Sequence, residues 1–132
     1  MKYKYLGCSK LKVSSICLGT MTFGEQSSKK EAFHMMDYAF RKKVNFFDTA
    51  EIYPVYPKKE TAGKTEEIIG EWLKIRKNRD KMIIATKIAS GHPKGVGATG
   101  LKWIRGGYKK LGFDKKNINK AIDGSLKRLK TD

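Results

Sequence analysis

Three polar side chains that could transfer a proton, Asp48, Tyr53 and Lys87, lie at or just beyond the carboxyl ends of two apolar runs of the sequence. A phenol ionises only near pH 10, so by itself it is a poor proton donor at neutral pH. A nearby ammonium such as that of Lys87 favours the ionised phenol, and the carboxylate of Asp48 can orient that ammonium. A phenol made more acidic in this way suits protonation of a carbonyl oxygen while a hydride reaches the carbon.

The same residues have a plainer interpretation, which their spacing alone leaves equally open. Asp48 would then cap a turn, Tyr53 would pack on the rim of the fold, and Lys87 would be a surface amine. The choice depends on whether the surrounding elements bring the three side chains together. In α/β chains with parallel strands, ligands and chemistry collect at the carboxyl ends of the strands.

The hydrophobic pattern predicts a β-hairpin followed by three buried parallel strands, each with a helix after it. The hairpin spans residues 3–13, with a polar turn at 7–9. The strand runs are residues 16–22, 44–48 and 82–88. Right-handed crossovers would bring the carboxyl ends of these strands to one edge of a sheet, where Asp48, Tyr53 and Lys87 would meet.

Capping signals and apolar stripes predict the three helices. Ser28 and Glu31 have the spacing of a capping box at the first helix. Thr65 can cap the second helix, and Asn117 the third. Helical spacing predicts these buried faces, in chain order: Phe33, Met36, Ala39 and Phe40; Ile68, Ile69, Trp72 and Leu73; Ile118, Ile122, Ser125, Leu126 and Leu129.

A long segment rich in glycine and lysine, residues 90–116, separates the third strand from the third helix. Loops of this length are either functional or mobile. Its glycine spacing matches neither G-x-x-x-x-G-K-[ST] nor G-x-G-x-x-G, so a phosphate cradle is not expected. Trp103 and Tyr108 are interpreted as aromatic anchors of this segment, and His34 and His92 as surface histidines.

Charge and composition narrow the classes of function. The chain has 132 residues and a formal net charge of +16, but only five of its 29 basic residues are arginine. Lysine is mainly a solvated point charge, whereas base and phosphate recognition favours arginine. The basic residues are also spread along the chain, so a solvated surface is expected rather than a specific nucleic-acid site.

Cysteine usage and hydropathy point to an ordinary cytoplasmic domain. Cys8 and Cys17 are too few for a disulfide framework and are expected to be free thiols. The two histidines make a zinc site improbable by composition, and no metal is expected. The sequence contains no apolar run of membrane-spanning length and no signal-peptide pattern, so neither membrane contact nor secretion is expected.

Specific stretches of the sequence resemble the aldo-keto reductase family. The stretch DTAEIY at residues 48–53, preceded by LGTMTFG at 18–24 and followed by ATK at 85–87, looks like the family's first active-site segments. The continuation Tyr53-Pro54 and the closing SLKRLKTD at 125–132 resemble its bacterial Tas-type branch. The resemblance runs over essentially the whole chain, apart from the segment 90–116.

The resemblance implies a (β/α)₈ barrel that binds NADPH without a Rossmann fold and reduces aldehydes and ketones. It implies Tyr53 as the general acid, Lys87 as the residue that makes Tyr53 more acidic, and Asp48 as the support of Lys87. A first-strand segment would lie near the nicotinamide: Gly19, Thr20 and Met21.

A full barrel of this kind takes about 250 residues, so residues 1–132 correspond to its N-terminal part, a hairpin and about three strand–helix units. The family's histidine at the fourth strand and most of the NADPH site would lie beyond residue 132. We therefore expect a partial aldo-keto reductase domain, cut before the fourth strand, whose substrate is a small carbonyl compound. The alternative is a noncatalytic remnant that binds another barrel half, a second copy of itself or an acidic partner.

Overall fold

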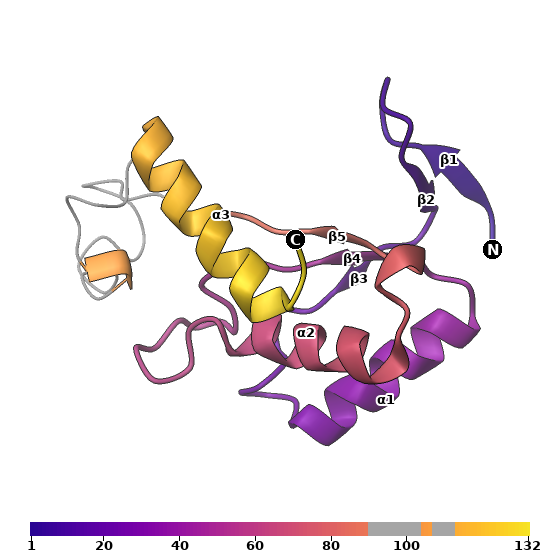
Figure 1. Cartoon of the computed structure of the whole chain (residues 1–132). Coiled ribbons are helices and arrows are strands. Elements are labelled where there is room, and N and C mark those ends of the chain that lie inside the picture. The colour runs from indigo at the N-terminus through magenta and orange to yellow at the C-terminus, as the bar shows by residue number, and fades with distance from the viewer. Residues whose placement is uncertain (90–103, 107–112) are drawn as a thin grey trace.

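The polypeptide forms a two-stranded hairpin before it enters a three-stranded parallel sheet (Figure 1). The computed structural model describes residues 1–89, 104–106 and 113–132. Its strands are β1 (Tyr3–Tyr5), β2 (Lys12–Ser14), β3 (Leu18–Gly19), β4 (Phe46–Asp48) and β5 (Ile83–Ala85). Its helices are α1 (Lys29–Arg41), α2 (Lys64–Arg76) and α3 (Lys115–Leu129), with short 3-10 turns η1 (Arg79–Lys81) and η2 (Ile104–Gly106).

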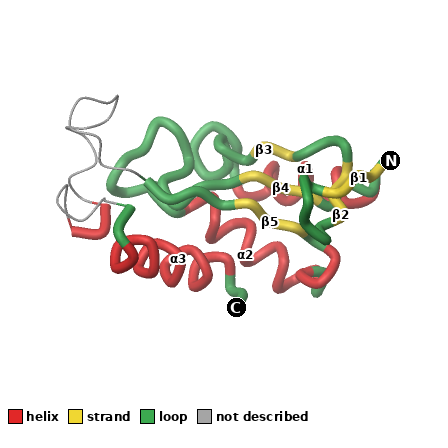
Figure 2. Tube along the Cα trace, turned by 90° about the horizontal axis from the view of Figure 1, so that it is seen from above, coloured by secondary structure: helices red, strands yellow, loops and turns green. Residues whose placement is uncertain are grey.

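The predicted hairpin is confirmed, and it lies at the amino end of the parallel sheet (Figure 2). Asn45, just before β4, holds it there. The Asn45 side-chain oxygen accepts from the Ser14 N–H at 2.7 Å, and its amide nitrogen donates to the Lys12 carbonyl at 3.0 Å. The opposite end of the sheet, where the strands lead into loops, is left free for the candidate site.

The sheet has the order β3-β4-β5, and all its strands are parallel. Gly19, Asp48 and Ala85 lie side by side in one row of the register. The regular strands are shorter than predicted, because single hydrogen bonds replace the ladder beyond this row. The Glu51 N–H, for example, donates to the Lys87 carbonyl at 3.0 Å, so the β4 and β5 exits stay adjacent.

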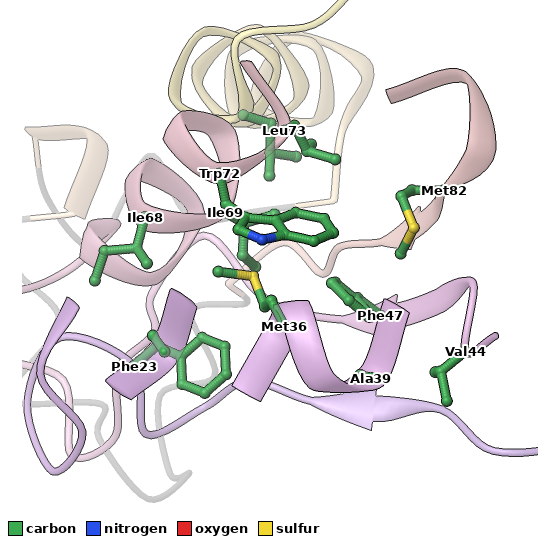
Figure 3. Packing of buried hydrophobic residues seen from close by; sticks show 12 residues of the cluster. Phe23, Met36, Ala39, Val44, Phe47, Ile68, Ile69, Trp72, Leu73 and Met82 are labelled. Atoms are coloured by element: carbon green, nitrogen blue, oxygen red, sulfur yellow. The ribbon is translucent and has the colours of Figure 1, made fainter. Parts of the chain in front are cut away.

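Helices α1 and α2 cover one face of the sheet and form the hydrophobic core with it (Figure 3). Trp72 of α2 is fully buried and packs on Phe47 of β4, with ring centroids 5.5 Å apart. Met36 and Ala39 of α1 are buried in the same cluster. The predicted core positions of α1 and α2 are therefore confirmed, with Phe33 and Phe40 partly rather than fully buried.

Helix α3 packs against α2 at a close crossing. A Cβ atom added to Gly70 would lie 2.3 Å from the Arg128 carbonyl oxygen, so only glycine permits this approach. The buried face of α3 is formed by Ala121, Ser125 and Leu129. The prediction that Ile122 is buried is wrong, since it is 43% exposed, and the contact face is rotated toward Ala121.

Two of the three predicted N-caps also need correction. The capping box at Ser28 is confirmed. Helix α2 is capped by Gly63 rather than Thr65, whose hydroxyl lies inside the first turn and donates to another segment. Helix α3 begins earlier than predicted, because the Asp114 carboxylate accepts from the Asn117 N–H at 3.1 Å and caps the helix itself.

The other face of the sheet carries no helix in the part of the chain that the structure describes (Figures 1 and 2). Phe46, Ile83 and Ala85 lie on this face and are half-buried. Within the same described ranges, no helix is both long and apolar enough to cross a membrane.

Candidate active site

The structure brings together the three side chains whose types suggested proton transfer. The Lys87 ammonium lies 2.5 Å from Asp48 Oδ1 and 2.7 Å from the Thr49 carbonyl oxygen. It also lies 5.0 Å from the centroid of the Tyr53 ring. The ammonium is therefore fixed between a carboxylate and the face of a phenol, at the carboxyl edge of the sheet.

The site is open to solvent. The side chains of Lys87 and Asp48 are 47% and 40% exposed, although they form an ion pair. Exposed ion pairs of this kind contribute little to stability, about 0–1 kcal/mol. Holding two charged groups in one geometry at an open edge therefore does little for the fold, and it leaves the pair accessible to a ligand.

Backbone hydrogen bonds determine where Tyr53 lies. Its N–H donates to the Ala50 carbonyl at 3.1 Å, which turns the chain after β4. Its carbonyl accepts from the Gly63 N–H at 2.9 Å, at the start of α2. The Val55 N–H donates to the Met21 carbonyl at 2.9 Å and thereby joins the β4 exit loop to the β3 exit.

The three residues expected near a nicotinamide lie at the β3 exit, beside Asp48. A Cβ atom at Gly19 would meet nothing within 4 Å, and Met21 is 49% exposed, so the space over this strand end is open. Thr20 has a different role here. It is fully buried, and its hydroxyl donates to the Asp48 carbonyl at 2.7 Å, which fastens β3 to β4.

Cys17 lies close enough to the site to respond to its charges, which its treatment as a simple free thiol did not foresee. Burial raises the pKa of the Cys17 thiol, the Asp48 carboxylate raises it further, and the Lys87 ammonium lowers it. The alternation of side chains along a strand could have predicted this proximity. Cys17 is two residues before Gly19 and therefore lies on the same face of the sheet.

Two buried carboxylates beside the site were also missed. Glu51 is only 6% exposed, and its carboxylate accepts from the Ala89 N–H and from the Arg105 guanidinium. It thereby ties the β4 exit to the β5 exit and to η2. Glu66 of α2 is fully buried. The local sequence does not show that either residue is buried, because the arginines that pair with them are distant along the chain.

Other aromatic and imidazole groups considered from the sequence do not join the site. His34 is exposed on α1 and lines a hollow of about 870 Å³ along that helix, together with Phe33 and Arg76. His92, Trp103 and Tyr108 lie outside the described residues.

Parallel strand–helix units with helices on one face of the sheet and a polar cluster at the carboxyl ends of the strands are the pattern expected of part of a (β/α) barrel. A solved structure supports this class. The holo form of aldo-keto reductase AKR11C1 from Bacillus halodurans has a TM-score of 0.72 and 31% sequence identity to this chain. The match covers 100% of this chain and 37% of that one.

Comparison of sequences gives the same result. The model of the Aldo/keto reductase family matches residues 15–132. Protein Tas from Escherichia coli is 44% identical over 132 residues, which is 100% of this chain and 36% of Tas. The uncharacterized oxidoreductase YrpG from Bacillus subtilis is 42% identical over 133 residues, covering 100% of this chain and 37% of YrpG.

The chain therefore belongs to the aldo/keto reductase family, and the expected likeness to Tas is confirmed. Its fold corresponds to the N-terminal part of the family's barrel. The chain spans about a third of the length of these relatives.

Proposed function

We propose that this chain supplies the proton-donating part of an NADPH-dependent carbonyl reductase site, with Tyr53 as the acid. The observation that carries the proposal is the position of the Lys87 ammonium, 2.5 Å from Asp48 and 5.0 Å from the Tyr53 ring centroid. A cation held beside a phenol stabilises the negative charge that develops there as a proton is transferred. Asp48 and the Thr49 carbonyl keep the cation in place.

The proposed reaction uses these groups in one step. As hydride reaches the carbonyl carbon of an aldehyde or ketone, negative charge develops on the carbonyl oxygen. Tyr53 transfers its proton to that oxygen, and Lys87 stabilises the phenolate that remains. The alcohol then leaves, and Tyr53 regains a proton from solvent, to which the site is open.

In this proposal the nicotinamide ring would lie at the β3 exit. NADPH would supply the hydride, and the open space over Gly19 together with the exposed side chain of Met21 leaves room for its ring beside Asp48. Thr20 would act indirectly, since its hydroxyl is already engaged with the Asp48 carbonyl. A small-molecule carbonyl compound would occupy the same open edge, next to Tyr53.

A chimera tests the proposal directly. Residues 1–132 would replace the matching segment of Tas, to which they are 44% identical, with Tas itself as the positive control. We expect the chimera to oxidise NADPH in the presence of small aldehydes and ketones. The 132-residue chain alone should bind NADPH weakly or not at all. A folded chimera that shows no turnover with carbonyl compounds on which the Tas control is active in the same assay would contradict the proposal.

A second candidate function, a binding module, is favoured by the half-buried sheet face at Phe46, Ile83 and Ala85. Such a face could pair with another barrel half, with a second copy of the chain or, given the charge of +16, with an acidic partner. Micromolar NADPH binding by the 132-residue chain, together with turnover, would exclude a purely noncatalytic role. Self-association without NADPH binding would favour it.

A further inference from the structure

The first turn of α2 contacts all three segments that carry the site. The Thr65 hydroxyl donates to the Phe23 carbonyl at 2.8 Å, on the β3 exit. The Gly63 N–H donates to the carbonyl of Tyr53 itself at 2.9 Å, on the β4 exit. Since helix α2 is packed in the hydrophobic core, its first turn is a rigid support for both loops.

The third contact of this turn, with the β5 exit, is made by a buried carboxylate. Glu66 is fully buried, and its Oε1 accepts from the Thr86 hydroxyl at 2.5 Å. Its Oε2 accepts from Arg128 Nε of α3 at 2.7 Å, so the charge is balanced by a cation. Burying a carboxylate is costly unless it is paired and hydrogen-bonded, and both Glu66 oxygens meet that condition here.

Thr86 directly precedes Lys87, and this makes the Glu66 contact relevant to the site. The Lys87 side chain is long and 47% exposed, and its ammonium is held by Asp48 and the Thr49 carbonyl. Fixing the backbone at its root leaves this long side chain fewer conformations and so favours the observed geometry. The Glu66–Thr86 hydrogen bond fixes that root from the helix side of the sheet.

We propose that Glu66 is a positioning residue for Lys87 and acts through the Thr86 hydroxyl. By fixing the end of β5, it keeps the ammonium between Asp48 and the ring of Tyr53. The geometric part of this inference concerns the chain by itself. Only its consequence for turnover rests on the proposed function, so the two can be tested separately.

The Cys17 thiol provides a readout that needs no catalysis, because the Lys87 ammonium lowers its pKa. In the 132-residue chain, Thr86→Val removes the hydroxyl and leaves the Glu66–Arg128 pair intact. We expect alkylation of Cys17 by iodoacetamide at pH 8 to slow about twofold, as Lys87 moves away and less thiolate is present. Peptide mass spectrometry separates Cys17 from Cys8, which serves as the internal reference.

Matched variants make the result decisive. Lys87→Met should slow Cys17 alkylation at least as much as Thr86→Val, whereas Thr86→Ser should restore the wild-type rate. Ser125→Ala removes a hydroxyl that accepts from Arg128 at 3.3 Å and should leave the rate unchanged, because the Glu66–Thr86 hydrogen bond is kept. A Thr86→Val rate equal to or above that of the wild type, measured alongside a slowed Lys87→Met, would overturn the inference.

The consequence for turnover is measured in the Tas chimera. Thr86→Val should lower kcat roughly tenfold with KM little changed, because misplacement of a catalytic group acts on the transition state. Thr86→Ser should recover kcat. Unchanged kcat in an active Thr86→Val chimera would overturn the inference, whereas a chimera inactive in every form counts against the proposed function and leaves the thiol result decisive for Glu66.

Discussion

The two faces of the parallel sheet differ in what covers them. On one face, Phe47 is fully buried under Trp72 and Met36, within a core built from α1 and α2 (Figure 3). On the other face, the adjacent residue Phe46 is half-buried, and the described residues place no helix over it. The covered face therefore provides the stability of the fold, while the open face carries the candidate site.

The ion pairs on the two sides of the sheet also differ in how exposed they are and in what they connect. On the covered side, the Arg76 guanidinium donates two hydrogen bonds to the Asp37 carboxylate, at 2.8 and 2.6 Å. The Trp72 ring N–H donates a third at 2.8 Å. On the open side, the ion pair of Asp48 and Lys87 keeps 40% and 47% of its side chains exposed. The first arrangement joins two helices, whereas the second leaves its charges available to a ligand.

Two neighbouring phenylalanines test this division with the largest expected effect. Phe47→Ala should lower the free energy of unfolding by about 3–5 kcal/mol, because it opens a cavity in the covered core. Phe46→Ala removes the same side chain from the open face and should cost about 1 kcal/mol, because less apolar area returns to water. Urea unfolding monitored by circular dichroism measures both. Equal losses in the two variants would show that the faces do not differ as described.

Two aspartates test the division with a smaller effect. Asp37→Asn should cost about 1 kcal/mol at pH 7, whereas Asp48→Asn should cost less, because its pair is more exposed. The Arg76 guanidinium holds the pKa of Asp37 below its ordinary value, with a further contribution from Trp72. The stabilisation from Asp37 is therefore present above about pH 4 and is lost as the pH falls through its lowered value.

Urea unfolding at a series of pH values checks this sign. The difference in stability between the wild type and Asp37→Asn should be full at neutral pH and should shrink in acid. A difference that grows as the pH falls would contradict the assigned ion pair. Glu71, whose pKa is lowered by Lys29, contributes in the same direction and is unchanged in both proteins, so it cancels in the comparison.

The periodic parts of the sequence predicted the covered face well. The stripe of Ile68, Ile69, Trp72 and Leu73 specifies the core face of α2, because an amphipathic helix has only one side to bury. The α3 stripe was less successful: Ala121 is buried and Ile122 is exposed. The rotation of α3 is set by its close crossing with α2 at Gly70. The apolar periodicity of the α3 sequence does not show where the two helices make contact.

On the open face, the sequence predicted the contact between Asp48 and Lys87 but not the buried carboxylates beside it. Asp48 and Lys87 were expected to meet because parallel strands align their carboxyl ends, and the structure places them in contact. Glu66 and Glu51 could not be predicted, because their burial depends on partners distant in sequence, such as Arg128 and Arg105. The sequence marks a charged residue as polar but does not show what will surround it.

The most direct test of the central claim compares two tyrosines of one loop in the Tas chimera. Tyr53→Phe should lower carbonyl turnover by at least about 100-fold while NADPH binding is retained, because the proton donor is lost and the loop is kept. Tyr56→Phe, at a residue that is 84% exposed, should leave turnover unchanged. Near-normal turnover in Tyr53→Phe would contradict the assignment of Tyr53 as the acid.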